Sequence, residues 1–147
     1  MSQRLLIADD HATARRLLRA MLETRAGWQV CGEAENGLEA VAKTAELKPD
    51  VIILDLAMPL MDGLHAAQRI SATSPTVPIL MYTTHNFEGL DLEAKKVGVL
   101  KVISKTASAD ALLMAIEEAL NATVPQASPQ GVVSPASAIK GKAEKPK

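Results

Sequence analysis

Apolar residues follow two alternating kinds of pattern over the first 121 residues of the chain. Short apolar runs, three of them almost continuously apolar, are typical of parallel strands that are covered on both faces. These runs predict five strands, at residues 5–8, 28–32, 51–54, 79–82 and 99–103.

The segments between these runs carry apolar residues three and four positions apart, which is the spacing of one helix face. This spacing predicts five helices, around residues 14–22, 38–45, 64–70, 87–97 and 112–120. Gly89 lies inside the fourth of these stripes and costs about 1 kcal/mol relative to Ala. We therefore expect the fourth helix to be the least stable of the five.

Residues that are preferred at the ends of helices flank the predicted helices. Asn36 and Asp62, each followed by glycine, and Ser108 are side chains that cap helix N-termini. Gly98 follows the fourth helix, where a left-handed residue commonly ends a helix. Strands that alternate with helices through short connections predict a parallel sheet wrapped by helices, with right-handed crossovers.

Composition and charge exclude several classes of protein. The chain is 48 % apolar and 2 % aromatic, so a core of aliphatic residues is expected. Its net charge of -1 disfavours nucleic-acid binding by bulk electrostatics. Cys31 is the only cysteine, which excludes an internal disulfide and cysteine metal clusters. No apolar run is long enough for a membrane span or a signal peptide, and we expect a cytoplasmic protein.

Composition changes near residue 121. Residues 122–147 hold four lysines against one glutamate, and four prolines with serines between them. Such a segment buries too little apolar surface to offset its ordering entropy. The sequence therefore predicts a domain over residues 1–121 and a flexible tail over 122–147.

Polar side chains that could take part in chemistry lie at the carboxyl ends of four of the predicted strands. Asp9 and Asp10 follow the first strand, Asp55 the third, Thr83 the fourth and Lys105 the fifth. Because ligands of parallel sheets bind at the carboxyl ends of the strands, we expect these groups to share one edge.

Three crowded carboxylates repel one another and call for a cation, and Mg²⁺ suits oxygen ligands. A site with a bound cation, a lysine and a hydroxyl is suited to a phosphoryl group. A carboxylate within it can itself be the phosphoryl acceptor. Asp55 is the candidate acceptor because it ends the central strand, whereas Asp9 and Asp10 have the character of ion ligands.

Four motifs together resemble the receiver domains of response regulators in two-component signalling. They are LIADDH at residues 6–11, LDLAMPLMDG at 54–63, YTT at 82–84 and SK at 104–105. The resemblance covers about residues 3–121 and is nearest to receivers that precede helix-turn-helix output domains. It implies a flavodoxin-like (βα)5 three-layer α/β sandwich, with a parallel five-stranded sheet of strand order 2-1-3-4-5.

The resemblance also implies a Mg²⁺ site. Asp10 would ligate the ion directly, with Asp9 assisting and with Asp55 and the backbone carbonyl of Ala57 as further ligands. His11, next to the acidic pair, is expected to be a solvated side chain.

The remaining roles carried over concern phosphotransfer and its readout. Asp55 would accept a phosphoryl group from a histidine kinase or phosphotransfer protein, while Thr83 and Lys105 would bind phosphoryl oxygens. Ala57 and His85 are candidates for tuning dephosphorylation. Residues 87–104 would form the surface that contacts a downstream protein, and phosphorylation-linked homodimerisation is left open.

The chain departs from the receiver pattern at two positions. Val102 stands three residues before the lysine, where receivers commonly carry Tyr or Phe, so coupling through a rotating aromatic ring is absent. Thr106 replaces the proline that often follows the lysine through a cis bond, and a cis bond without proline costs about 3 kcal/mol.

Other functions compete with a phosphorelay receiver. One is a transcriptional regulator that lacks its DNA-binding output domain, since residues after 121 are too few and too polar for a helix-turn-helix. Another is a haloacid-dehalogenase-type phosphatase, but that class needs an acid where Ala57 stands, so we do not expect a conventional enzyme. A third is a basic tail that docks a partner or an anionic surface.

Overall fold

The computed structural model describes residues 2–85 and 87–123. Over these residues the strands are β1 (Gln3–Ala8), β2 (Trp28–Ala34), β3 (Val51–Leu54), β4 (Ile79–Thr83) and β5 (Lys101–Ser104). The helices are α1 (Ala12–Leu22), α2 (Gly37–Leu47), α3 (Gly63–Thr73), α4 (Leu90–Lys96) and α5 (Ala109–Thr123).

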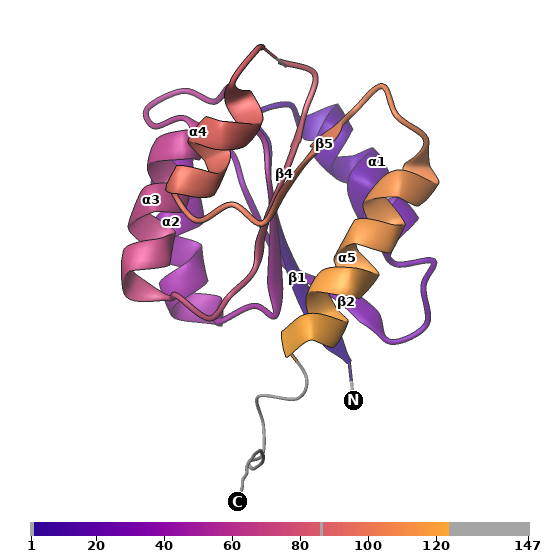
Figure 1. Ribbon diagram of the computed structural model, residues 1–147. Coiled ribbons are helices and arrows are strands. Elements are labelled where there is room, and N and C mark those ends of the chain that lie inside the picture. The colour runs from indigo at the N-terminus through magenta and orange to yellow at the C-terminus, as the bar shows by residue number, and fades with distance from the viewer. Residues whose placement is uncertain (1, 86, 124–147) are drawn as a thin grey trace, which may run out of the picture.

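The five strands form one parallel sheet in the order β2-β1-β3-β4-β5, which confirms the expected strand order. Helices α1 and α5 cover one face of the sheet, and α2, α3 and α4 cover the other (Figure 1). This is the predicted three-layer α/β sandwich. Strand β3 lies in the middle of the sheet, and all four of its residues are buried.

Two apolar layers hold the sandwich together, one on each face of the sheet. Ile53 and Leu80 belong to the layer beneath α1 and α5, whereas Ile52 and Met81 belong to the layer beneath α2, α3 and α4. Successive side chains of a strand point to opposite faces, and here both faces are covered. The continuous apolar runs in the sequence therefore reflect burial on both sides.

Side-chain caps start two helices where the sequence predicts them. The Asn36 side chain accepts a hydrogen bond from the Glu39 amide of α2, and Asp62 does the same for the His65 amide of α3. Gly98 is left-handed, with a φ of 96°, as expected for the residue that ends the fourth helix.

Several predicted boundaries were wrong by two or three residues, and contacts of the backbone explain two of them. Helix α4 begins at Leu90 and not near residue 87, because Gly89 adopts a left-handed φ of 91° and forms its cap. Strand β5 begins at Lys101 and not at Val99, whose amide donates to the Ala94 carbonyl at 2.9 Å and so completes the turn after α4. Helix α5 continues to Thr123, beyond Leu120, the last residue of the apolar stripe that predicts it.

The rest of the predicted tail, residues 124–147, lies outside the described residues. Within residues 2–85 and 87–123, no helix combines the length and apolar character needed to cross a membrane.

Removing the Asn36 cap is expected to destabilise the fold. Glu39 completes the cap by accepting a hydrogen bond from the Glu35 amide at 3.0 Å, so Asn36→Ala leaves the start of α2 without its main acceptor. The expected cost is about 1 kcal/mol of unfolding free energy. Urea unfolding followed by the fluorescence of Trp28, the single tryptophan, measures it. Asn36→Asp, which retains an acceptor, is the control, and equal stability of the two variants would contradict the assignment.

Candidate functional site

Three charged residues leave the sheet at the same edge because their backbones remain hydrogen-bonded to it. The amides of Asp9, Asp55 and Lys105 donate to carbonyl oxygens at the ends of β2, β1 and β4, at 3.0, 2.9 and 2.9 Å. Each residue is thus held one position beyond its own strand. The sheet register, and not the intervening loops, sets where these side chains start.

The Lys105 ammonium group lies between two buried carboxylates. Its Nζ is 2.5 Å from Asp9 Oδ2 and 3.2 Å from Asp55 Oδ2. Asp9 is 3 % exposed and Asp55 is 5 % exposed. The structure therefore brings together the predicted acceptor, one predicted ion ligand and the predicted lysine, which are separated by 46 to 96 positions of sequence.

Backbone amides bind the other oxygen of each carboxylate. Asp55 Oδ1 accepts a hydrogen bond from the Leu56 amide at 2.7 Å, and Asp9 Oδ1 accepts one from the His11 amide at 2.9 Å. Both carboxylates are therefore oriented by fixed donors as well as by the lysine. A carboxylate must be held in one orientation in this way if it is to bind an ion or attack a substrate atom.

Burial and ion pairing act in opposite directions on the pKa values of this pair. Burial alone would raise the pKa of Asp9, but hydrogen bonds from Lys105 and from the His11 amide outweigh it and hold this pKa below its usual value. Burial alone would lower the pKa of Lys105, but Asp9 and Asp55 raise it above its usual value. Both groups are therefore charged at neutral pH.

Asp10 and His11 extend the acidic site toward solvent. His11 Nδ1 is 3.1 Å from Asp10 Oδ1 and 3.3 Å from Asp9 Oδ1. The His11 side chain is exposed, as expected, but its ring nitrogen faces the acidic pair, which sequence reasoning missed.

The donor set fits a hard divalent cation. One ligand atom from each of Asp9, Asp10 and His11 lies within 4.8 Å of the others. Lys105 neutralises only part of the charge of three neighbouring aspartates, and carboxylate oxygens are preferred ligands of Mg²⁺. The residues that are present therefore suit Mg²⁺.

The other predicted residues lie in the loops around this edge. Ala57 is half-buried in the loop after β3, two residues after Asp55. Thr83 is fully buried at the end of β4, and its Oγ1 accepts a hydrogen bond from the His85 amide at 3.0 Å. In that hydrogen bond Thr83 Oγ1 is the acceptor. The hydrogen of the Thr83 hydroxyl can therefore still be donated to another oxygen. The His85 side chain is exposed.

Sequence reasoning also missed Arg15 of α1. This side chain is buried, and its Nη1 donates to the backbone carbonyl of Asp9 at 2.6 Å. Arg15 is spaced from the buried Leu18 and Leu22 as one helix face requires. That spacing is the signal in the sequence that could have identified it as inward-facing.

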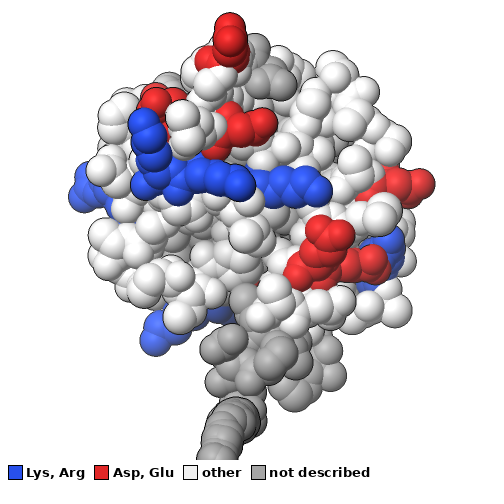
Figure 2. Space-filling view, in the orientation of Figure 1, with Lys and Arg blue, Asp and Glu red and all other residues white. Residues whose placement is uncertain are grey.

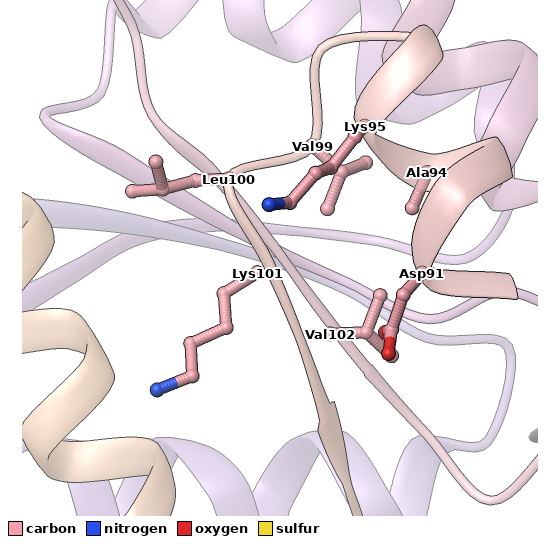
Figure 3. Close-up of a pocket in the computed structure, with 7 residues that line it drawn as sticks. All are labelled: Asp91, Ala94, Lys95, Val99, Leu100, Lys101 and Val102. Atoms are coloured by element: carbon pink, nitrogen blue, oxygen red, sulfur yellow. The ribbon is translucent and has the colours of Figure 1, made fainter.

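Val102, which stands where receivers often carry an aromatic residue, is half-buried beside a hollow between α4 and β5. The hollow has a volume of about 390 Å³, and Figure 3 shows its lining residues around it. They are Asp91, Ala94, Lys95, Val99, Leu100, Lys101 and Val102. Figure 2 shows basic side chains over this part of the surface, with acidic side chains next to them.

Side-chain hydrogen bonds hold the turn after Lys105, where Thr106 stands at the position that is often proline in receivers. The Thr106 amide donates to Ser104 Oγ at 3.1 Å, and the two hydroxyl oxygens are 2.7 Å apart. Thr106 thus brings a backbone donor and a hydroxyl that proline lacks.

Removing the Lys105 charge is expected to change how stability depends on pH. At pH 7, Lys105→Met should lower the unfolding free energy by about 1–3 kcal/mol, because two buried carboxylates lose their cation. The Asp9 contribution in the wild type is present above its unfolded pKa of about 3.9 and is lost as pH falls through its lower folded pKa. The stability gap between the two proteins should therefore narrow below about pH 4.

Urea unfolding of both proteins between pH 2 and pH 7 measures this gap, with the exposed Lys101→Met as the control. A gap of constant size across this range would show that the Asp9–Lys105 pair does not contribute as described.

Comparisons with known proteins agree with the geometry. The family described as response regulator receiver domain matches residues 5–117. The chain is 40 % identical over 116 residues to the chemotaxis protein CheY of Listeria monocytogenes. This alignment covers 79 % of this chain and 97 % of that CheY. The chain is 44 % identical over 107 residues to a protein-glutamate methylesterase/protein-glutamine glutaminase of Methanosarcina mazei, covering 71 % of this chain but only 30 % of that protein.

A solved structure shows the same fold. The response regulator domain of Thermotoga maritima CheB aligns with a TM-score of 0.76 and 33 % identity, over 82 % of this chain and 98 % of that domain. Receiver domains are signalling proteins and not conventional enzymes, and they typically bind Mg²⁺ at an acidic pocket. The chain belongs to the response regulator receiver domain family of two-component signalling.

Proposed function

We propose that this receiver accepts a phosphoryl group on Asp55 from a histidine kinase or phosphotransfer protein, and signals through protein contacts that depend on phosphorylation. The observation that supports this proposal most strongly is the position of the Lys105 ammonium group, 3.2 Å from an Asp55 carboxylate oxygen and in contact with Asp9 as well. A nucleophile, a fixed cation and an acidic ion site thus meet at one edge of the sheet.

The transfer is a displacement at phosphorus. A carboxylate oxygen of Asp55 attacks the phosphorus of a phosphohistidine, an O–P bond forms, and the P–N bond breaks. The imidazole leaves with the bonding electrons, and the product on this chain is an acyl phosphate. Catalysis then depends mainly on positioning and on stabilising the charge of the phosphoryl oxygens.

Lys105 and Thr83 would bind those oxygens. Lys105 remains protonated at neutral pH because its carboxylate partners raise its pKa, so its ammonium group can pair with a phosphoryl oxygen. Thr83 can donate its hydroxyl hydrogen to another phosphoryl oxygen, since Thr83 Oγ1 only accepts in its hydrogen bond with the His85 amide. Rotation of Thr83 toward the phosphoryl group would start the response in β4.

Asp9, Asp10, Asp55 and the Ala57 carbonyl would hold Mg²⁺ at this site. When bound, the ion supplies stabilisation of negative charge on the phosphoryl oxygens. The buried carboxylate of Asp9 and the more exposed one of Asp10 would together face the ion.

Two further residues would set how long the phosphoryl group persists. Hydrolysis requires a water molecule to attack phosphorus while the Asp55 O–P bond breaks. Ala57 has a small side chain two residues from Asp55, and the exposed His85 follows Thr83 by two residues. We assign the tuning of dephosphorylation to these two positions.

The downstream partner would dock on residues 87–104, which include α4 and β5. Leu92 and Leu100 are exposed there although they are large and apolar. Lys95 and Lys101 line the hollow beside Val102 (Figure 3). With no aromatic ring at position 102, this hollow is open to a side chain from a partner.

Phosphorylation is tested directly by mass. Incubation with Mg²⁺ and acetyl phosphate, a small phosphodonor, should add the mass of one phosphoryl group to the intact protein, and the gain should be lost on acid treatment. Asp55→Asn should abolish the gain because an amide cannot form the acyl phosphate.

Asp62→Asn is the matched control, because Asp62 is an acid of the same loop whose capping role asparagine preserves. It should gain mass as the wild type does. Absence of any gain in the wild type, or an equal gain in Asp55→Asn, would contradict the proposal.

The output surface is tested by the amide chemical shifts of the protein before and after phosphorylation. Residues 87–104 should shift together with the site, whereas the loop at residues 74–77, after α3, should not. Shifts confined to the neighbours of Asp55 would count against residues 87–104 as the output surface.

A further inference from the structure

Arg15 is a buried cation that the proposed phosphotransfer does not use. It lies on the face of α1 that packs against the sheet and is 9 % exposed. Its Nη1 donates to the Asp9 carbonyl at 2.6 Å, its Nε donates to Glu33 Oε1 at 3.0 Å, and its Nη2 is 3.8 Å from Glu35 Oε2. A buried guanidinium with these three contacts has a fixed position.

The carbonyl that Arg15 binds belongs to the peptide bond between Asp9 and Asp10. That peptide unit is planar, so holding its oxygen restricts the orientation of both acidic residues. The Asp9 amide is already held by the carbonyl of Ala34 at the end of β2, at 3.0 Å. The backbone of Asp9 is therefore held from both sides.

We propose that Arg15 is a positioning residue for the cation site, which orients the Asp9–Asp10 pair through its backbone. This inference rests on the proposed Mg²⁺ site and adds a residue to it. Arg15 touches neither the carboxylate oxygens of the pair nor Asp55 in the contacts found among the described residues.

Glu33 at the end of β2 holds the guanidinium in place. Its two carboxylate oxygens accept from Arg15 Nε at 3.0 Å and from Arg19 Nη1 at 2.5 Å. Burial would raise the pKa of Glu33, but these two arginines lower it, so Glu33 is ionised at neutral pH. Arg19 shares Glu33 with Arg15 but has no hydrogen bond or ion pair to Asp9 in the described part of the chain.

Positioning and charge predict opposite effects of removing Arg15. If Arg15 acted only through its charge, its loss would strengthen the binding of a divalent cation, because one repelling charge would be gone. Glu33 and Glu35 offset that charge at close range. We therefore expect the loss of orientation to dominate and Mg²⁺ affinity to fall about tenfold, which is typical when a partner that orients a ligand is removed.

The experiment is a Mg²⁺ titration of ¹⁵N-labelled wild type, Arg15→Met and Arg19→Met, followed by amide chemical shifts. Arg15→Met should bind Mg²⁺ more weakly than the wild type, whereas Arg19→Met should retain the wild-type affinity. The His11 amide should also shift in metal-free Arg15→Met but not in metal-free Arg19→Met, since it donates to Asp9 Oδ1 and so reports the orientation of Asp9.

Unchanged or tighter Mg²⁺ binding by Arg15→Met, or an equal loss in Arg19→Met, would overturn the proposal. If Arg15→Met does not fold, Arg15→Lys decides the question, because it retains the charge but not the planar fork of donors. Weakened binding by that variant supports positioning, and wild-type binding refutes it. A wild type that does not respond to Mg²⁺ would contradict the proposed cation site, and the metal-free His11 shift would still test Arg15.

Discussion

The ion pairs of the Lys105 ammonium group with Asp9 and Asp55 are the interaction on which the rest of this molecule depends. Two aspartates that are almost fully buried face one lysine, and Asp10 adds a further negative charge at the rim. Removing carboxylates from water is costly unless they are paired and hydrogen-bonded. The site is therefore stable with Lys105 in place but still carries excess negative charge. This remaining negative charge suits a divalent cation, which the proposed phosphotransfer requires.

The parallel sheet, whose core is aliphatic, brings these charged groups together. All five strands end at one edge, and the first residue beyond β1, β3 and β5 is still hydrogen-bonded to a neighbouring strand. The apolar layers on the two faces hold the strands in register (Figure 1). The backbone of the sheet thus places charged groups that are far apart in sequence within hydrogen-bonding distance. The conformation of the loops is not needed for this.

Features set by local sequence could be predicted, and features set by tertiary contacts could not. The strand at residues 51–54 and the caps at Asn36 and Asp62 follow from apolar runs and from side chains that bind the next amides. Helix α4 and strand β5 begin later than their apolar residues suggest, because Gly89 is left-handed and the Val99 amide bonds back to α4. An apolar pattern reports burial, and burial extends beyond the ends of regular elements.

The candidate site shows the same division. Asp9, Asp55 and Lys105 could be expected at one edge because each lies at the carboxyl end of a predicted strand, and parallel strands end together. Arg15 and the ring nitrogen of His11 were missed because their partners are a backbone carbonyl and a pair of carboxylates brought near by the fold. Charged residues at the start of a helix are most often solvated. Only the spacing of Arg15 from Leu18 and Leu22 indicated otherwise.

The central claim is that Asp55, and no other acid of this edge, carries the phosphoryl group. The most direct measurement treats the phosphorylated protein with borohydride, which reduces an acyl phosphate to an alcohol, and then locates the altered residue by peptide mass spectrometry. The account predicts homoserine at position 55 and unaltered aspartate at positions 9 and 10. Homoserine at either of those positions, with aspartate retained at 55, would contradict it.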